Sequence, residues 1–199
     1  MRVSLNELEA TGRKAAIGLG VPVGLAQDAA GAVTWLAEAG MPALPALLDA
    51  LAVYRTADVS ILTLGPSAID RFLVDGENRS FGPCAGALVM FGLVACANPR
   101  PEQITVTLSD AKAAASVMTV SGDGVTLSDG GISGSCTVVL SGTSGSTASH
   151  PTVRAINRFG VEVSDADWQA LEAYAALTLV PADARSREKG AGAGLVDRD

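Results

Sequence analysis

The chain has 199 residues, of which 48% are hydrophobic and only 4% aromatic, and it carries a formal net charge of −7. This length suffices for a single domain, residues 1–199, whose core needs neither disulfides nor metals. The acidic charge and the lack of a basic stripe in the sequence argue against nucleic acid or a membrane surface as a partner. With so few aromatic residues, the core should consist of closely packed Ala, Val and Leu.

The sequence indicates neither a metal site nor a cofactor. It contains three cysteines and one histidine, His150, without a Cys-x-x-Cys pair, so we expect no zinc site of the usual spacing. No phosphate-loop motif is present. The N-terminal segment has acidic residues where a secretory signal would be apolar, and the cysteines do not form a disulfide framework, so we expect a cytoplasmic protein.

The first part of the chain, residues 4–57, predicts a layer of three amphipathic helices. Ser4 and Glu7 form a capping box, S-x-x-E, at the start of the first helix. Pro22 suits the first turn of the second helix, and Gly40 suits a left-handed stop at its end. Apolar residues at three- and four-residue steps place the helices at about 4–19, 22–40 and 43–54.

The stretch FGPCAGALVMFGLVACA, residues 81–97, carries no charge and predicts a buried central helix. Pro83 suits the beginning of this helix, and Asn98 and the prolines beyond it end it. The run is shorter than a membrane span requires. Before it, the pattern predicts a strand at 60–64, one or two helical turns at 67–72 and an exposed turn at 75–80.

After the central helix the hydrophobic period changes to that of strands, which predicts a sheet built from residues 104–163. Glycine-rich turns favour antiparallel hairpins. Ser164 or Asp165 should cap a last helix, 165–180, followed by a tail, 181–199. The expected strands are 104–108, 115–120, 125–128, 136–141 and a long one at 153–163. Helical and strand segments are segregated, so we predict an α+β fold.

Arg154 and Arg158 are the first candidates for a ligand site. They share one face whether the segment is a strand or a helix. Residues 130–153 before them carry no charge and include Ser146, Thr147 and His150. One interpretation is a pocket for a carboxylate or phosphate, with the two arginines on one side and Ser146, Thr147 and His150 close to its mouth. The alternative is a flexible surface loop beside arginines that pair with Glu162.

Cys84 and His150 are the candidates for catalysis. At the second position of a helix, the Cys84 thiolate would be favoured by the helix dipole, and His150 would act as a base. The alternative is that Cys84 is a small core residue in an Ala/Gly-rich run. Nothing in the sequence fixes His150 near Cys84.

The chain resembles an uncharacterised bacterial family, domain of unknown function 3726 (DUF3726). The resemblance rests on VSLNELEATGRKAAIGLGVPVGLAQDAAGAVTWLAEAG at the start, on VEVSDADWQALEAYAALTLVPA and on the ending GAGAGLVDRD. It implies a small cytosolic domain without an established activity, and hence no catalytic residues to transfer.

Three hypotheses for function follow from the sequence. The chain is a binding or accessory protein for an anionic small molecule, an enzyme with Cys84 as nucleophile, or a structural subunit that forms a homo-oligomer through its tail, 181–199. Selective, fast alkylation of Cys84 over Cys96 and Cys136 is expected only of the enzyme.

If Arg154 and Arg158 bind an anion, anionic metabolites should raise the melting temperature of the wild type. They should fail to do so for the Arg154→Ala/Arg158→Ala double variant, which should itself stay folded. If Glu162 is instead the partner, no anion should give a saturable shift. Glu162→Gln should then destabilise the protein about as much as loss of the arginines.

Overall fold

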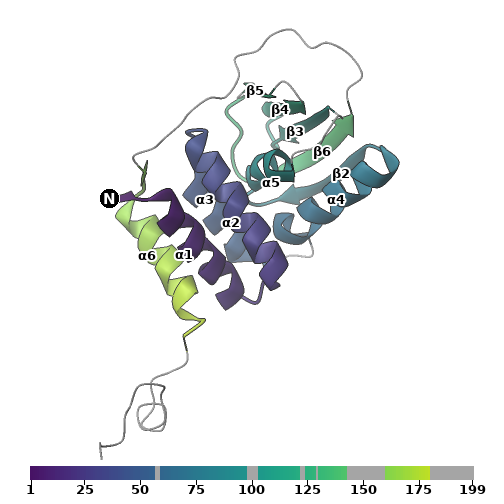
Figure 1. Cartoon of the computed structure of the whole chain (residues 1–199). Helices are drawn as coiled ribbons and strands as arrows, with labels where there is room; N and C mark the ends of the chain where they lie inside the picture. The colour runs from purple at the N-terminus through teal and green to yellow at the C-terminus, as the bar shows by residue number, and fades with distance from the viewer. Residues whose placement is uncertain (57–58, 98–102, 122–123, 129, 143–159, 180–199) are drawn as a thin grey trace, which may run out of the picture.

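The computed structural model describes residues 1–56, 59–97, 103–121, 124–128, 130–142 and 160–179, and all structural statements below concern these residues. Figure 1 shows them in colour. Within these ranges no helix combines the length and the apolar character that crossing a bilayer would require.

Six helices are present in the described part of the chain. Serine caps begin the first and the last of them, as the sequence predicts: Ser4 Oγ accepts a hydrogen bond from the Glu7 N–H (3.1 Å), and Ser164 Oγ accepts one from the Asp167 N–H (3.0 Å). The helices are α1 Leu5–Gly18, α2 Val23–Glu38, α3 Ala43–Val53, α4 Ile61–Asp75, α5 Val89–Ala97 and α6 Asp165–Ala176.

Five antiparallel strands form the main sheet in the order β2-β6-β3-β4-β5. A separate two-stranded sheet pairs β1 Arg2–Val3 with β7 Val161–Glu162. The strands of the main sheet are β2 Arg79–Cys84, β3 Ile104–Ser109, β4 Ala115–Ser121, β5 Gly124–Ser128 and β6 Cys136–Gly142. Segregated helices and an antiparallel sheet confirm the predicted α+β fold.

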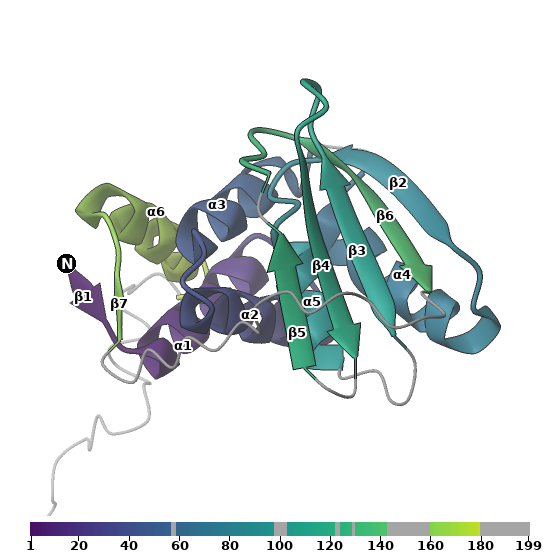
Figure 2. The ribbon, with the colours of Figure 1, turned by 90° about the horizontal axis from the view of Figure 1, so that it is seen from above.

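α5 lies in the middle of the molecule, α4 lies toward its side near β2, and the two helices cover one face of the sheet (Figures 1 and 2). α4 packs over β2 and β6, and α5 packs over β3 and β4. On its other side α5 packs against α2, around which α1, α3 and α6 complete the helical layer. The core therefore consists of the inner face of the sheet, both faces of α5 and the inner stripes of the surrounding helices.

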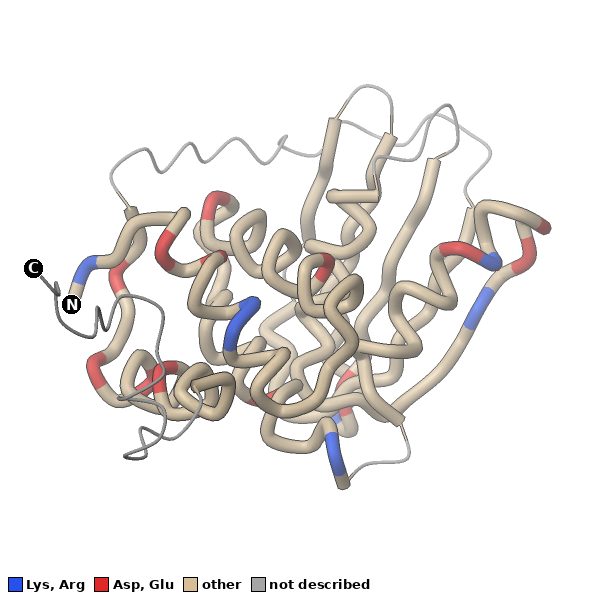
Figure 3. The backbone as a smooth tube through the Cα atoms, turned by 60° about the horizontal axis from the view of Figure 1, so that its bottom comes forward, with Lys and Arg blue, Asp and Glu red and all other residues tan. Residues whose placement is uncertain are grey.

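Charge distribution follows this layering. β3, β4, β5 and β6 contain no Lys, Arg, Asp or Glu. The charged residues of the described chain lie on the helices, on β1, β2 and β7, and in the turns (Figure 3). β3 shows the expected alternation, because Ile104, Val106 and Leu108 are fully buried while the threonines between them are half-buried.

The predicted boundaries of the central helix are wrong at its N-terminal end. Residues 79–84 form the edge strand β2, residues 85–88 form a turn, and the helix begins only at Val89. Gly82 (φ 121°) and Gly86 (φ 64°) adopt backbone conformations that a right-handed helix cannot contain. Pairing of Phe81 with Val138 of β6 adds a strand where the sequence suggests helix.

Two further predictions need correction. Residues 60–64 do not form a strand, because Ser60 caps α4 by accepting a hydrogen bond from the Leu62 N–H (3.3 Å). The buried residues of α4 recur with a helical period over the whole helix, but the five residues 60–64 are too few to show it. The long strand predicted at 153–163 is described only as β7, which pairs with β1 and does not join the main sheet. Residues 153–159 lie outside the described part.

Asp110 holds together the turn after β3 and the segment before β6. Its Oδ1 accepts hydrogen bonds from the N–H groups of Lys112 (2.8 Å) and Ala114 (3.0 Å). Its Oδ2 accepts from the N–H (3.1 Å) and the hydroxyl (3.4 Å) of Ser133. Burial alone would raise the pKa of this carboxyl, but the hydrogen bonds outweigh it and hold the pKa below its usual value of 3.8.

Replacing Asp110 with alanine should lower the urea midpoint of unfolding, because several N–H donors lose their acceptor. The pKa is lower in the folded state, so the stability that the carboxylate contributes is present above pH 3.8 and is lost as the pH falls through the folded-state pKa. The difference between wild type and Asp110→Ala should therefore shrink in acid. Glu172→Ala, at an exposed position of α6, is the control. A difference independent of pH would contradict the role of the charge.

Candidate functional site

Most of the site residues predicted from the sequence lie outside the described part of the chain. These are Arg154, Arg158, Ser146, Thr147 and His150. Their prediction as an anion site, and that of His150 as a base, is therefore untested.

Glu162, the alternative partner of the arginines, lies on β7 and is exposed. Its Cα is the register partner of Arg2 on β1. Oppositely charged residues at such cross-strand positions attract one another, typically by about 0.2–1 kcal/mol. Arg2 is thus a basic neighbour of Glu162, in addition to Arg154 and Arg158, whose pairing with Glu162 is the alternative prediction.

Cys84 is not at the start of a helix. It is the last residue of β2, it is fully buried, and its register partner is Cys136 of β6. Burial raises the pKa of the Cys84 thiol above its ordinary value, and the neighbouring Cys136 raises it further by a smaller amount. The helix-dipole argument for a reactive Cys84 is therefore wrong, because a buried thiol with a raised pKa is a poor nucleophile.

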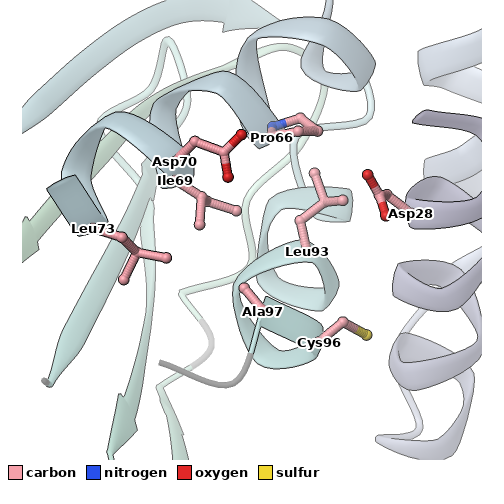
Figure 4. Close-up of a pocket in the computed structure, with 8 residues that line it drawn as sticks. All are labelled: Asp28, Pro66, Ile69, Asp70, Leu73, Leu93, Cys96 and Ala97. Carbon is pink, nitrogen blue, oxygen red and sulfur yellow. The ribbon is translucent and has the colours of Figure 1, made fainter. Parts of the chain in front are cut away.

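A different site is formed between α2, α4 and α5. It is an open cleft of about 310 Å³, and Figure 4 shows the side chains around it. The walls are mainly apolar, with two carboxylates and one thiol among them. The lining residues are Asp28 from α2, Pro66, Ile69, Asp70 and Leu73 from α4, and Leu93, Cys96 and Ala97 from α5.

Small residues on the helices create the cleft. A Cβ atom on Gly92 would lie 2.1 Å from the carbonyl oxygen of Ala32, so α5 is in backbone contact with α2. A Cβ atom on Gly65 would lie 2.8 Å from Leu93 Cδ1, so α4 also approaches α5 closely. α5 thus forms the floor, and the diverging α2 and α4 form the walls.

The cleft is electrostatically negative. Asp28 and Asp70 extend from the two walls, with Leu93 of the floor between them in Figure 4. The ion pairs found among the described residues involve neither aspartate. The C-terminal end of α5, at Ala97, also lies in the cleft, and the C-terminal end of a helix carries partial negative charge. All three features favour a cation.

Cys96 points from α5 toward α2 at one end of the cleft (Figure 4). The residue is exposed, although apolar neighbours bury part of its sulfur. This burial raises the pKa of the Cys96 thiol, and the carboxylates of Glu38, Asp28 and Glu9 raise it further. The thiol is therefore neutral near pH 7, and Cys96 is a reporter of the cleft and not an activated nucleophile.

The structure gives no sign of a metal site in the cleft. Among the residues that are described, no group of three or more His, Cys, Asp or Glu side chains is arranged to hold a metal ion. Two carboxylates on opposite walls are better suited to an organic cation that spans the space between them.

No sequence signal marks this site. Asp28, Asp70 and Cys96 come from three helices. The two aspartates have the sequence context of ordinary surface positions, and Cys96 belongs to the apolar run 81–97. Only the packing of α2 and α4 on α5 brings them together.

Comparison with known proteins finds a family model that matches the N-terminal part of the chain, and it indicates no function. Residues 3–73 match the family model described as Protein of unknown function (DUF3726). The match confirms the resemblance over α1, α2, α3 and most of α4, whereas residues 161–182 and 190–199 lie outside it. No curated protein and no solved structure matches the chain.

Proposed function

Taking the chain as a DUF3726 protein over residues 3–73, we propose that it binds a small organic cation in the cleft between α2, α4 and α5. The observation that carries this proposal is the pair of carboxylates, Asp28 and Asp70, on opposite walls of an apolar cleft. Two of the three helices around the cleft, α2 and α4, lie wholly or mostly in the family match.

The volume and lining define the ligand class. A cleft of about 310 Å³ is at the small end of ligand pockets. Ile69, Leu73 and Leu93 supply apolar contact, so a primary or secondary amine with a short apolar body fits the lining. Because both aspartates are exposed, each ion pair contributes only about 0.2–1 kcal/mol, and most of the affinity has to come from apolar contact.

A binding role is better supported than catalysis. Cys84 is buried and Cys96 has a raised pKa, so neither offers a thiolate at neutral pH. A metabolic accessory protein, located in the cytoplasm, remains our hypothesis for the biological setting. A homo-oligomer formed through residues 181–199 is a further part of that hypothesis.

The hypothesis that Arg154 and Arg158 bind an anion concerns a different part of the chain. The charge of the ligand distinguishes it from the proposal that the cleft binds an amine. Amines should bind through the aspartates, and anions through the arginines. A screen that contains both classes, matched in size, therefore separates the two sites.

Small amines should raise the melting temperature of the wild type in a saturable manner and should slow alkylation of Cys96. The Asp28→Asn/Asp70→Asn double variant should bind them about twofold to thirtyfold more weakly, which corresponds to the loss of two exposed ion pairs. Isothermal titration calorimetry at two salt concentrations measures the loss.

The matched control is Asp49→Asn/Glu172→Gln, which removes the same charge from exposed positions on α3 and α6 outside the cleft. It should bind amines as the wild type does. Equal weakening in both double variants would reduce the effect to net charge, and amine binding that neither variant changes would exclude the cleft.

A further inference from the structure

Cys84 and Cys136 lie opposite each other on two neighbouring strands of the main sheet. Cys84 ends β2, Cys136 begins β6, and the two are register partners in the antiparallel pair, just after a register irregularity between Phe81 and Cys84. Opposite residues in a regular antiparallel pair have Cα atoms about 4.5 or 5.5 Å apart, depending on the hydrogen-bonding position. Disulfides require Cα separations of about 4.4–6.8 Å, so either position is compatible with a bond.

Both side chains are also on the same face. Opposite residues on paired strands project to the same side of the sheet. Cys84 and Cys136 are 0% and 1% exposed. Val138 and Leu140, which continue the buried alternation of β6, are both 0% exposed. The two thiols therefore meet at the inner face of the sheet, where neither contributes to the cleft described above.

A small molecule has a route to this pair. Cys136 lines a second cavity of about 140 Å³, together with Gly134, Gly86 and residues of α3. A cavity of this size holds several water molecules and hence admits a peroxide. The Cys136 thiol makes one weak contact, donating to the Gly134 carbonyl oxygen at 3.7 Å, which leaves it available for reaction.

We propose that Cys84 and Cys136 are a redox modification site, which a peroxide converts into a reversible cross-strand disulfide. One thiol attacks the peroxide, so that an S–O bond forms, the O–O bond breaks and water leaves. The second thiol then attacks the resulting sulfenic acid, the S–S bond forms, and a second water leaves. The two thiols lose two electrons in total, and the peroxide is reduced to water. A small thiol in excess reverses the step by exchange.

The disulfide would link β2, at the edge of the sheet, to β6, close to the start of α5. Among the described strands β2 pairs only with β6, and the turn 85–88 after Cys84 leads directly into α5. A disulfide would tie this edge strand covalently to its neighbour and raise the melting temperature, because it constrains the unfolded chain.

The rate of oxidation of the two thiols should depend on pH in one direction. Burial raises the pKa of both thiols. The Asp110 carboxylate raises the pKa of Cys136 further, and the Cys136 thiol, once ionised, raises that of Cys84. Little thiolate is present near pH 7, so the reaction should be slow there and should accelerate as the pH rises.

The test uses the full chain with Cys96→Ser, which removes the exposed thiol and its intermolecular disulfides. After native treatment with hydrogen peroxide, the mass should fall by two hydrogen atoms, and both thiols should resist alkylation in denaturant. Peptide mapping should show Cys84 linked to Cys136. Dithiothreitol should restore two alkylatable thiols and the original melting temperature.

Cys84→Ala and Cys136→Ala in the same background should each abolish the loss of two hydrogen atoms, and the peptide map remains decisive if either variant folds poorly. Two free thiols after peroxide treatment would overturn the proposal. Stepwise addition of oxygen to one cysteine, or linkage only in urea, would overturn it equally.

Discussion

The backbone contact between α2 and α5 is the constraint on which the rest of the structure depends. Gly92 lies so close to Ala32 that a Cβ atom on Gly92 would lie 2.1 Å from the Ala32 carbonyl oxygen, much less than a van der Waals contact. This contact places α5 at the centre of the molecule, with the sheet on one side and the helical layer on the other. A core poor in aromatic residues is stable because such close packing replaces large side chains.

The candidate sites follow from the position of α5. Its C-terminal half forms the floor of the cleft because α2 and α4 both pack on it and diverge above it. The turn before its N-terminus is preceded by Cys84 on β2, opposite Cys136.

The sequence predicts the parts of the fold in which one period persists. α1, α2, α3 and α6 and the four strands between 104 and 142 are confirmed, because caps and alternation specify them locally. The start of the central helix is wrong because a run of Gly, Pro, Cys and Ala has no period, and only pairing with β6 makes residues 79–84 a strand. The cleft has no local signal, since Asp28, Asp70 and Cys96 meet through tertiary packing alone. The arginine site stays a prediction.

The most direct measurement is the free energy of unfolding of Gly92→Ala, with Gly31→Ala as its control. A Cβ atom at Gly31 of α2 would meet only Cys96 Sγ, at 4.0 Å, an ordinary contact. Alanine is the better helix former, so Gly31→Ala should be neutral or stabilising by up to about 1 kcal/mol. Gly92→Ala should instead destabilise by about 3 kcal/mol or more, because α2 and α5 must separate. Equal stability of the two variants would contradict the central role of this contact.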